Sequence, residues 1–247
     1  MSLEKAAKLI ADLRRQRQSI MRLPDNCKPQ TEEDAYALQA KVADLLKLEV
    51  AAWKVSASGP RGATAAPILA GRIFNSPAAI ETTSLLETEI ALKLNRDLPI
   101  RSAGGYTRED ILEGIEAYAL AFELVDYRLS APDMSFPERL ADCLANDGLV
   151  LGVPQPFTED FTSPVHKLSL FFDSTPEPFK PADIDPVESL RAYASIGGDA
   201  LGGLKAGQWV ITGSMTGMQK VNAAGTWQAF WDSKLDVSLD ILGATDQ

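Results

Sequence analysis

The feature that most constrains the fold is a ten-residue alternation that begins at Leu85 and ends at Leu94. With a period of two, one face carries Leu86, Thr88, Ile90, Leu92 and Leu94, and the other carries Glu87, Glu89, Ala91 and Lys93. This pattern predicts a β-strand in which the Cα atoms of the two glutamates lie about 6.5–7 Å apart on one side. Both carboxylates can then converge on one divalent cation if a third oxygen donor arrives from elsewhere. The alternative is an amphipathic strand whose charged face lies in solvent.

Composition narrows the class of protein. The 247 residues are 45% hydrophobic and 23% charged, which is typical of one large globular domain. The net charge of −10 argues against a nucleic-acid partner, and no apolar run reaches the roughly 18 residues that a membrane span needs. Cys27 and Cys143 form neither a disulfide framework nor a zinc-ligand spacing. Together with an N-terminus that lacks a signal-peptide hydrophobic region, this predicts a cytoplasmic protein.

The chain has one histidine, His166, which lies in a proline-containing loop. A histidine-based catalytic triad or a two-histidine metal site is therefore not expected. Any bound metal would have oxygen ligands, and these favour the hard ions magnesium, manganese and calcium.

The order of helical and strand patterns predicts an α+β protein that is helical at the start and strand-rich at the end. Thr31 is expected to cap the second helix, with Asp34 in the capping-box position. We expect helices over 3–22, 31–47, 107–120, 138–146 and 186–201. We expect strands over 50–55, 85–94, 121–129, 149–153, 167–172, 208–212, 227–231 and 235–242. Residues 1–48 then form a helical N-terminal region and residues 49–247 a β-rich catalytic region, within one continuous unit.

Several segments in this order resemble a known family. They are Trp53-Lys54-Val55, Leu86-Glu87-Thr88-Glu89-Ile90-Ala91, Asn95-Arg96-Asp97-Leu98, Ala121-Phe122-Glu123-Leu124-Val125-Asp126, Leu140-Ala141-Asp142, Leu149-Val150-Leu151-Gly152 and the run from Leu204 to Thr216. The series resembles the 2-keto-4-pentenoate hydratase and 4-oxalocrotonate decarboxylase branch of the fumarylacetoacetate hydrolase superfamily, over most of the chain. The resemblance implies a fumarylacetoacetate-hydrolase-like fold, a twisted mixed β-sheet roll with a helical N-terminal region.

The resemblance also implies a metal site. The positions that match the family's metal ligands are Glu87, Glu89 and Glu123, and the ion would be Mg²⁺ or Mn²⁺. Physical chemistry agrees, because three nearby carboxylates repel one another strongly without a cation between them. Considered alone, Glu123 would be interpreted as a surface residue at a helix–strand junction.

Five further positions match residues that act on the substrate in this family. Lys54 matches the catalytic lysine, which would be partly desolvated near a metal and would have a lowered pKa suited to carrying a proton. Gly213, Ser214 and Thr216 match a loop that holds the substrate carboxylate, and Asp142 matches a group that orients water. The alternatives are a strand-end lysine with its ammonium group in water and a plain turn after a strand.

The expected activity is that of a hydratase, which adds water to a 2-hydroxy-2,4-dienoate or 2-oxo-enoate. A decarboxylase of the 4-oxalocrotonate type is the nearest alternative. Hydrolytic carbon–carbon cleavage ranks third, because it needs an activated water and usually a His–Glu pair. A non-catalytic partner subunit is a further possibility of a different class. The partners implied are a small 2-oxo or 2-hydroxy carboxylate and further copies of the chain in a homo-oligomer.

Overall fold

The computed structural model describes residues 3–60, 62–101, 104–158, 167–232 and 234–243. His166 lies outside these described residues. The helices are α1 (Leu3–Gln16), α2 (Glu32–Leu46), α3 (Arg108–Leu112), α4 (Phe136–Ala141) and α5 (Pro186–Ile196), with short 3₁₀ turns η1 (Asp25–Cys27) and η2 (Cys143–Ala145). The strands are β1 (Val50–Ser56), β2 (Thr64–Leu69), β3 (Ile73–Asn75), β4 (Ala78–Ile80), β5 (Leu85–Leu94), β6 (Ile115–Val125), β7 (Asn146–Leu151), β8 (Gln155–Pro156), β9 (Leu168–Phe172), β10 (Thr175–Pro176), β11 (Trp209–Ile211), β12 (Gln219–Lys220), β13 (Gly225–Trp231) and β14 (Leu235–Ile241).

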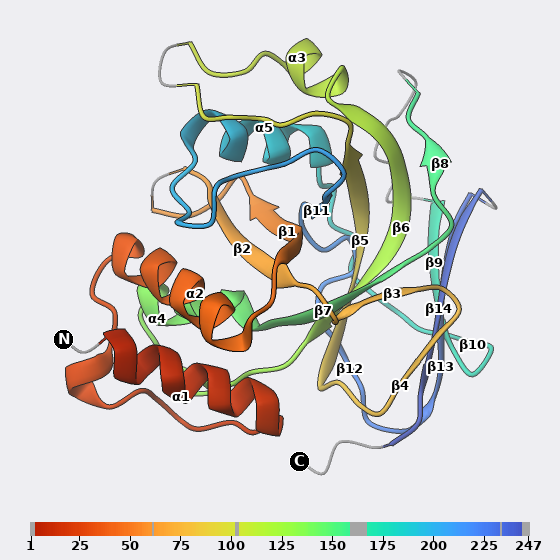
Figure 1. The fold of residues 1–247 in the computed structure, drawn as a ribbon. Coiled ribbons are helices and arrows are strands. Elements are labelled where there is room, and N and C mark those ends of the chain that lie inside the picture. The colour runs from red at the N-terminus through yellow and green to blue at the C-terminus, as the bar shows by residue number, and fades with distance from the viewer. Residues whose placement is uncertain (1–2, 61, 102–103, 159–166, 233, 244–247) are drawn as a thin grey trace.

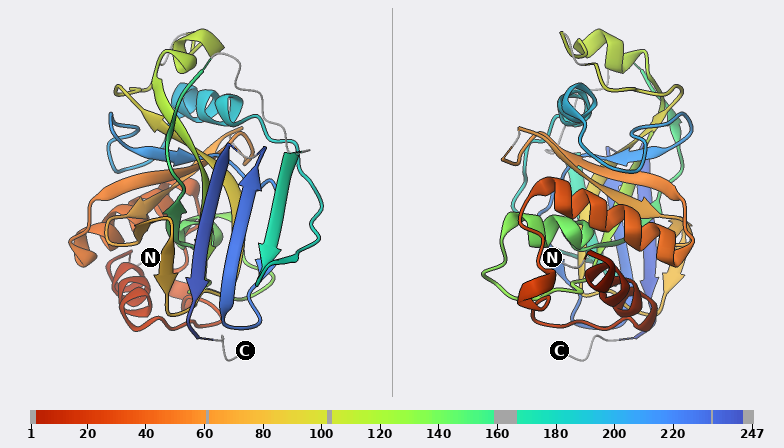
Figure 2. Two further views of the ribbon diagram at one scale, coloured as in Figure 1. Left: turned by 90° about the vertical axis from the view of Figure 1, so that its right-hand side faces the viewer. Right: turned by 60° about the vertical axis from the view of Figure 1, so that its left-hand side comes forward.

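These strands form two sheets, which Figures 1 and 2 show packed against each other. The larger sheet has the order β2-β1-β11-β5-β6-β7-β3, with β12 beside β5 and β8 beside β6. The smaller sheet has the order β10-β9-β13-β14-β4 and stands upright in the left view of Figure 2. Parallel and antiparallel pairs occur in both sheets. The α+β class and the mixed-sheet architecture predicted from the sequence are therefore confirmed.

The largest hydrophobic cluster fills the space between the two sheets and under α5. At a contact between the two sheets, the backbone around Gly152 leaves no room for a side chain. A Cβ atom at this position would lie 2.1 Å from the backbone oxygen of Asp236 and 2.9 Å from that of Leu120. The backbone N–H of Gly152 donates to this same Leu120 oxygen at 2.8 Å. A glycine here allows the backbones of the two sheets to meet.

A second hydrophobic cluster joins α1, α2 and α4. Figure 2 shows α1 and α2 lying side by side along one flank of the larger sheet. Thr31 caps α2 by the predicted capping box with Asp34, and Lys47 ends the helix in the left-handed conformation. The division into a helical region over 1–48 and a β-rich region over 49–247 remains a prediction. Among the described residues, no helix has both the length and the apolar character needed to cross a membrane.

Several predicted boundaries were wrong. The first helix ends at Gln16 rather than residue 22, because Arg17 has a φ of 52° and Ile20 instead bridges to Leu129. The fifth helix ends at Ile196, where Gly197 is the C-cap. The helix expected over 138–146 occupies Phe136–Ala141.

The largest error concerns residues 107–120, which were predicted to be helical. The helix α3 ends at Leu112, and Ile115 already begins the long strand β6. Pairing with β5 from Leu94↔Ile115 to Leu85↔Val125 outweighs the helical propensity of the glutamate, leucine and alanine residues in this segment. The strand β2 was also missed, because all six of its residues are buried and it shows no alternation.

Candidate metal centre

The pairing of β5 with β6 places Glu87 directly opposite Glu123. Glu89 follows two positions along β5, so its side chain lies on the same face. One carboxylate oxygen from each of the three residues lies within 4.8 Å of the others. The structure therefore brings together the three glutamates that the sequence predicts as metal ligands, although Glu123 is far from the other two along the chain.

This face of the larger sheet is not a solvent face. Glu89 and Glu123 are fully buried, and the side chain of Glu87 is 14% exposed. The larger sheet curls, so that β2 lies against β7, and this inner face encloses a small apolar cluster. The buried members of the cluster are Ala52, Ile68, Ala91, Ala121, Leu149, Leu151 and Ile211. Three acidic groups thus converge in a largely dry environment, where uncompensated charge is costly.

Lys54 supplies a positive charge at the same place. Its Nζ lies 2.9 Å from Oε2 and 3.0 Å from Oε1 of Glu123, and 3.5 Å from Oε2 of Glu87. The strand β1 is held in register by parallel pairing with β11, in which Lys54 lies opposite Ile211. Trp53 reinforces this position, because its indole N–H donates to Oε1 of Gln208 at 3.0 Å. We call Glu87, Glu89 and Glu123 the carboxylate cluster. The amine of Lys54 lies against this cluster rather than in water at a strand end.

The electrostatics of these groups are strongly coupled. The pKa of Glu87 is raised to about 7, chiefly by burial; the positive charge of Lys54 lowers it and the negative charge of Glu123 raises it, and both are included in this value. Burial, followed by the charges of Glu123 and Glu87, raises the pKa of Glu89 well above its ordinary value. Burial alone would lower the pKa of Lys54, but attraction to Glu123 and the other carboxylates outweighs it and raises the pKa. The carboxylates thus raise the pKa of Lys54 in the structure, whereas the sequence predicted a lowered pKa near a metal.

The loop after β11 contacts the carboxylate cluster through Gly213, one of the residues predicted to bind the substrate. The backbone N–H of Gly213 donates to Oε2 of Glu89 at 2.7 Å. The Oγ of Ser214 is buried and has no hydrogen-bond partner among the described residues, and the same is true of the Oγ1 of Thr212. In contrast, the Oγ1 of Thr216 accepts from the backbone N–H of Thr88 at 3.2 Å and donates to the backbone oxygen of Gly217 at 3.0 Å. Ser214 is thus the member of the predicted loop with an uncommitted hydroxyl group.

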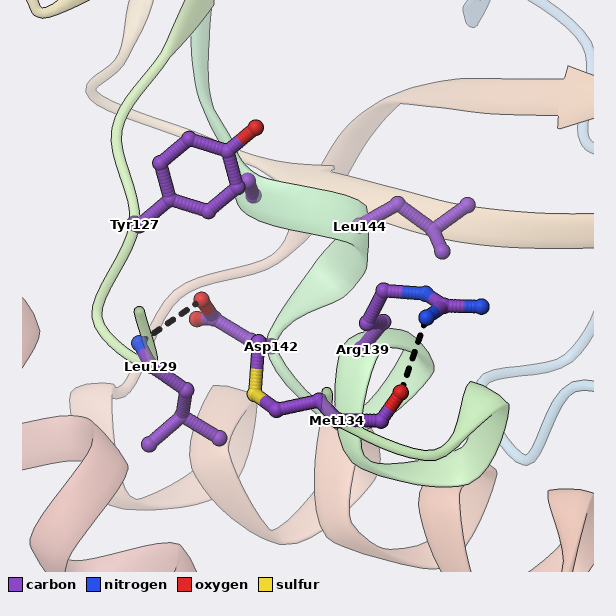
Figure 3. A pocket seen from close by; sticks show the side chains of 7 residues that line it. Tyr127, Leu129, Met134, Arg139, Asp142 and Leu144 are labelled. Carbon is purple, nitrogen blue, oxygen red and sulfur yellow. Dashed lines mark hydrogen bonds between the residues drawn. The ribbon is translucent and has the colours of Figure 1, made fainter. Parts of the chain in front are cut away.

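Asp142 lies in a different place from the three glutamates. Its carboxylate is buried and binds Arg128, with a distance of 2.6 Å between Oδ1 and the guanidinium Nε. The backbone N–H groups of Arg128 and Leu129 donate to its Oδ2. It is one of the residues that line a pocket with a cavity volume of about 140 Å³. Figure 3 shows it among the other lining residues, which are Tyr127, Leu129, Met134, Arg139, Leu144 and Ala145. Both oxygens of Asp142 are therefore already engaged, and its predicted catalytic role remains a prediction.

Asn146, the first residue of β7, also contacts the site and was not predicted from the sequence. Its Nδ2 donates to Oε1 of Glu123 at 2.9 Å, and the side chain is buried. The signal that could have found it is a polar residue at the head of an apolar strand that pairs next to the glutamate-bearing strand. Asn146 was instead predicted to be the last residue of the helix over 138–146.

Comparisons with known proteins bear on the fold. No protein-family model matches the chain, and no curated protein matches it by sequence. Among solved structures, the 4-oxalocrotonate decarboxylase from Pseudomonas putida G7, complexed with magnesium and adipate, matches with a TM-score of 0.80 and 13% identity. This match covers 97% of this chain and 97% of the decarboxylase chain.

Two hydrolases match more partially. The fumarylpyruvate hydrolase from Pseudomonas aeruginosa, in complex with Mn²⁺ and pyruvate, has a TM-score of 0.53 and 16% identity, covering 77% of this chain and 88% of its own. The maleylpyruvate hydrolase from Sphingobium sp. SYK-6, in complex with manganese(II) and pyruvate, has a TM-score of 0.51 and 16% identity, covering 78% of this chain and 71% of its own. These likenesses establish a shared fold, and the predicted fumarylacetoacetate-hydrolase-like architecture is confirmed.

Proposed function

We propose that this chain is a divalent-metal-dependent hydratase of the fumarylacetoacetate hydrolase superfamily, which adds water to a 2-hydroxy-2,4-dienoate or 2-oxo-enoate. One observation carries the proposal, namely the convergence of Glu87, Glu89 and Glu123 beside the amine of Lys54 in a buried site. Solved structures with the same fold contain magnesium or manganese together with small carboxylates, which supports this chemistry.

The donor set fits a hard divalent ion. All three candidate ligands are carboxylates, which Mg²⁺ and Mn²⁺ prefer. The Oε1 of Glu89 is buried and lacks a hydrogen-bond partner among the described residues, as expected for an atom whose partner is a cation. When bound, the ion would supply Lewis acidity and stabilise negative charge on the C2 oxygen of a 2-oxo acid.

The residues of the chain can perform the remaining tasks. Lys54 would carry the proton during tautomerisation to the conjugated 2-oxo-3-enoate, which makes C4 electrophilic toward water. Ser214 offers an uncommitted hydroxyl group beside Gly213, and the substrate carboxylate is a suitable acceptor. The apolar cluster on the same sheet face limits the access of bulk water to the reacting carbons.

Decarboxylation of a 2-oxo acid with a second carboxylate is the alternative function. The specific observation in its favour is the match with the 4-oxalocrotonate decarboxylase, which extends over nearly the whole of both chains. The same stabilisation of charge at the C2 oxygen would serve loss of carbon dioxide, so the carboxylate cluster supports both reactions equally.

The two functions are separated by their substrates. The purified protein is incubated with Mg²⁺ or Mn²⁺ and 2-hydroxypenta-2,4-dienoate, and the loss of the conjugated chromophore is followed by ultraviolet absorbance. A parallel assay measures carbon dioxide release from 2-oxohex-3-enedioate. Ion-dependent loss of the dienoate supports the hydratase, whereas carbon dioxide release alone supports the decarboxylase. If neither substrate reacts with either ion, both functions are wrong for this chain.

A further inference from the structure

A chain of buried contacts connects Glu123 to an ion pair that does not touch the carboxylate cluster. Asn146 donates from Nδ2 to Oε1 of Glu123 at 2.9 Å. The backbone oxygen of Asn146 accepts from a guanidinium nitrogen of Arg128 at 2.8 Å. Arg128 is bound in turn by Asp142, and the side chains of this pair are 3% and 2% exposed. The three residues thus form a connected support behind one of the three candidate ligands.

The backbone that delivers Asn146 is strained. Cys143, Leu144 and Ala145 have φ values of 55°, 52° and 65°, so three consecutive residues with side chains adopt the left-handed region. This conformation is unfavourable for each of them and persists only where the surroundings enforce it. Here the Arg128–Asp142 pair and the bond from the backbone N–H of Asp126 to the backbone oxygen of Ala145 do so. Strain of this kind is concentrated at functional sites.

We propose that Asn146 is a positioning residue that fixes the orientation of the Glu123 carboxylate for a small divalent ion. The inference rests on the proposed metal-dependent function. Asn146 and Lys54 both donate hydrogen bonds to Oε1 of Glu123. Oε2 lies 2.9 Å from the Nζ of Lys54 but is buried without a hydrogen-bond partner among the described residues, and this favours coordination of the ion through Oε2. The amide of Asn146 is neutral, so it orients the carboxylate without neutralising the negative charge that attracts the cation. Asp142 balances the charge of Arg128, so this support adds little net positive charge behind the ligands.

This role predicts selectivity between ions as well as affinity. Mn²⁺ and Mg²⁺ take single oxygens at short distances in near-octahedral geometry, whereas Ca²⁺ accepts both oxygens of one carboxylate at longer distances. Without the bond from Asn146, Glu123 is freer to rotate and offer both oxygens. Removing the amide should therefore weaken Mn²⁺ binding more than Ca²⁺ binding.

The experiment measures the dissociation constants of Mn²⁺ and Ca²⁺ by titration calorimetry on chelator-treated protein. Asn146→Leu removes the donor while keeping the same branching of side-chain heavy atoms, and Asn146→Ala is a second, smaller variant. Asn95→Ala is the matched control, because its Nδ2 donates to a backbone oxygen, that of Glu113, at a surface site away from the glutamates. Melting temperatures in chelator report on folding for every variant.

We expect both Asn146 variants to weaken Mn²⁺ binding by about 10–100-fold, as outer partners of metal ligands do, and to reduce the preference for Mn²⁺ over Ca²⁺. Asn95→Ala should change neither quantity. An unchanged Mn²⁺ affinity in the Asn146 variants would overturn the inference and leave the proposed function standing. Equal weakening for both ions, accompanied by a lower melting temperature in chelator, would also overturn it, since this is the result of a purely structural role. If the wild-type protein binds neither ion, the proposed function itself fails and the inference fails with it.

Discussion

Glu87 and Glu123 face each other across adjacent antiparallel strands, at a position where like charges normally destabilise a sheet. The Nζ of Lys54 lies 3.5 Å from the first carboxylate and 2.9 Å from the second. One ammonium group cannot balance three carboxylates, of which Glu89 is the third. Binding of a further cation between these carboxylates would therefore reduce their repulsion.

The first prediction concerns pH and stability without a divalent ion. The pKa of Glu87 is raised from 4.5 to about 7, so folding favours its protonated form. The stabilising contribution is complete below pH 4.5 and is lost as the pH rises through about 7. Since one pKa unit corresponds to about 1.4 kcal/mol, the loss amounts to at most about 3–4 kcal/mol. Urea unfolding in chelator, compared with Glu87→Gln at each pH, measures it.

Saturating Mn²⁺ should abolish this loss, because a bound cation stabilises the ionised carboxylate at neutral pH. A stability difference between wild type and Glu87→Gln that stays constant from pH 5 to pH 8 in chelator would contradict the prediction.

The second prediction concerns Glu89. Glu89→Gln keeps an oxygen that can accept from the backbone N–H of Gly213 and removes a buried acidic group. In chelator the variant should unfold at a temperature no lower than wild type. Mn²⁺ should raise the melting temperature of wild type and leave that of the variant unchanged, because a ligand has been lost. Glu116→Gln is the control on β6, where the side chain is 45% exposed and pairs with Lys93. A normal Mn²⁺ response of Glu89→Gln would remove this residue from the ligand set.

The third prediction separates proton transfer from ion binding. Lys54→Met retains the length of the side chain and removes the amine. Turnover should fall by about 10²–10⁴-fold, the usual contribution of a positioned acid–base group, while Mn²⁺ affinity is retained. Steady-state kinetics and calorimetry on the same preparation test both points. Lys93→Met removes a partly exposed amine on β5 and should retain turnover. Full activity of Lys54→Met would assign the proton transfer to another group.

The fourth prediction asks whether Asp142 serves stability, through its ion pair with Arg128, or catalysis. Because its carboxylate is paired with Arg128 in the interior, Asp142→Asn should destabilise the protein by about 3 kcal/mol. Asp12→Asn, in a solvent-exposed pair with Arg15, should cost about 1 kcal/mol or less. Urea unfolding at neutral pH gives both values. Loss of turnover with unchanged stability in Asp142→Asn would instead support the catalytic role that the sequence predicts.

The fifth prediction tests the junction of the two sheets. Gly152→Ala introduces a methyl group against the backbone oxygens of Asp236 and Leu120, neither of which can rotate away. The variant should lose about 1–3 kcal/mol of stability through overpacking. Chemical unfolding measures the loss. A variant as stable as wild type would indicate that the sheets can separate slightly at this point without cost.

The sequence was most informative where local patterns and tertiary structure agree. The alternation from Leu85 to Leu94 predicted β5 with its correct limits, and Thr31 with Asp34 predicted the start of α2. The segment after Leu112 was different, because its glutamate, leucine and alanine residues suit a helix and only the neighbouring strand makes it extended. A single sequence contains no direct record of that partner.

The candidate site shows the same division. Glu87 and Glu89 could be paired from their spacing, whereas Glu123 and Lys54 were assigned by resemblance to a family. The structure brings all four together through strand register. Asn146 was missed because its approach to Glu123 depends on three left-handed residues with no glycine among them. Such a turn is held by distant contacts rather than by local sequence preference.

The position of β11 between β1 and β5 has a consequence for biosynthesis. Lys54 lies on β1, and Glu87 and Glu89 lie on β5. Both strands are translated well before β11 (Trp209–Ile211), which joins them in the sheet. A nascent chain that has not yet exposed this segment lacks the bridge between them, and distant pairings of this kind form slowly. The chain must therefore have left the ribosome as far as Ile211 before the amine of Lys54 can meet its counterions in the complete sheet. Partial translation products should be unable to acquire the ion in its final surroundings.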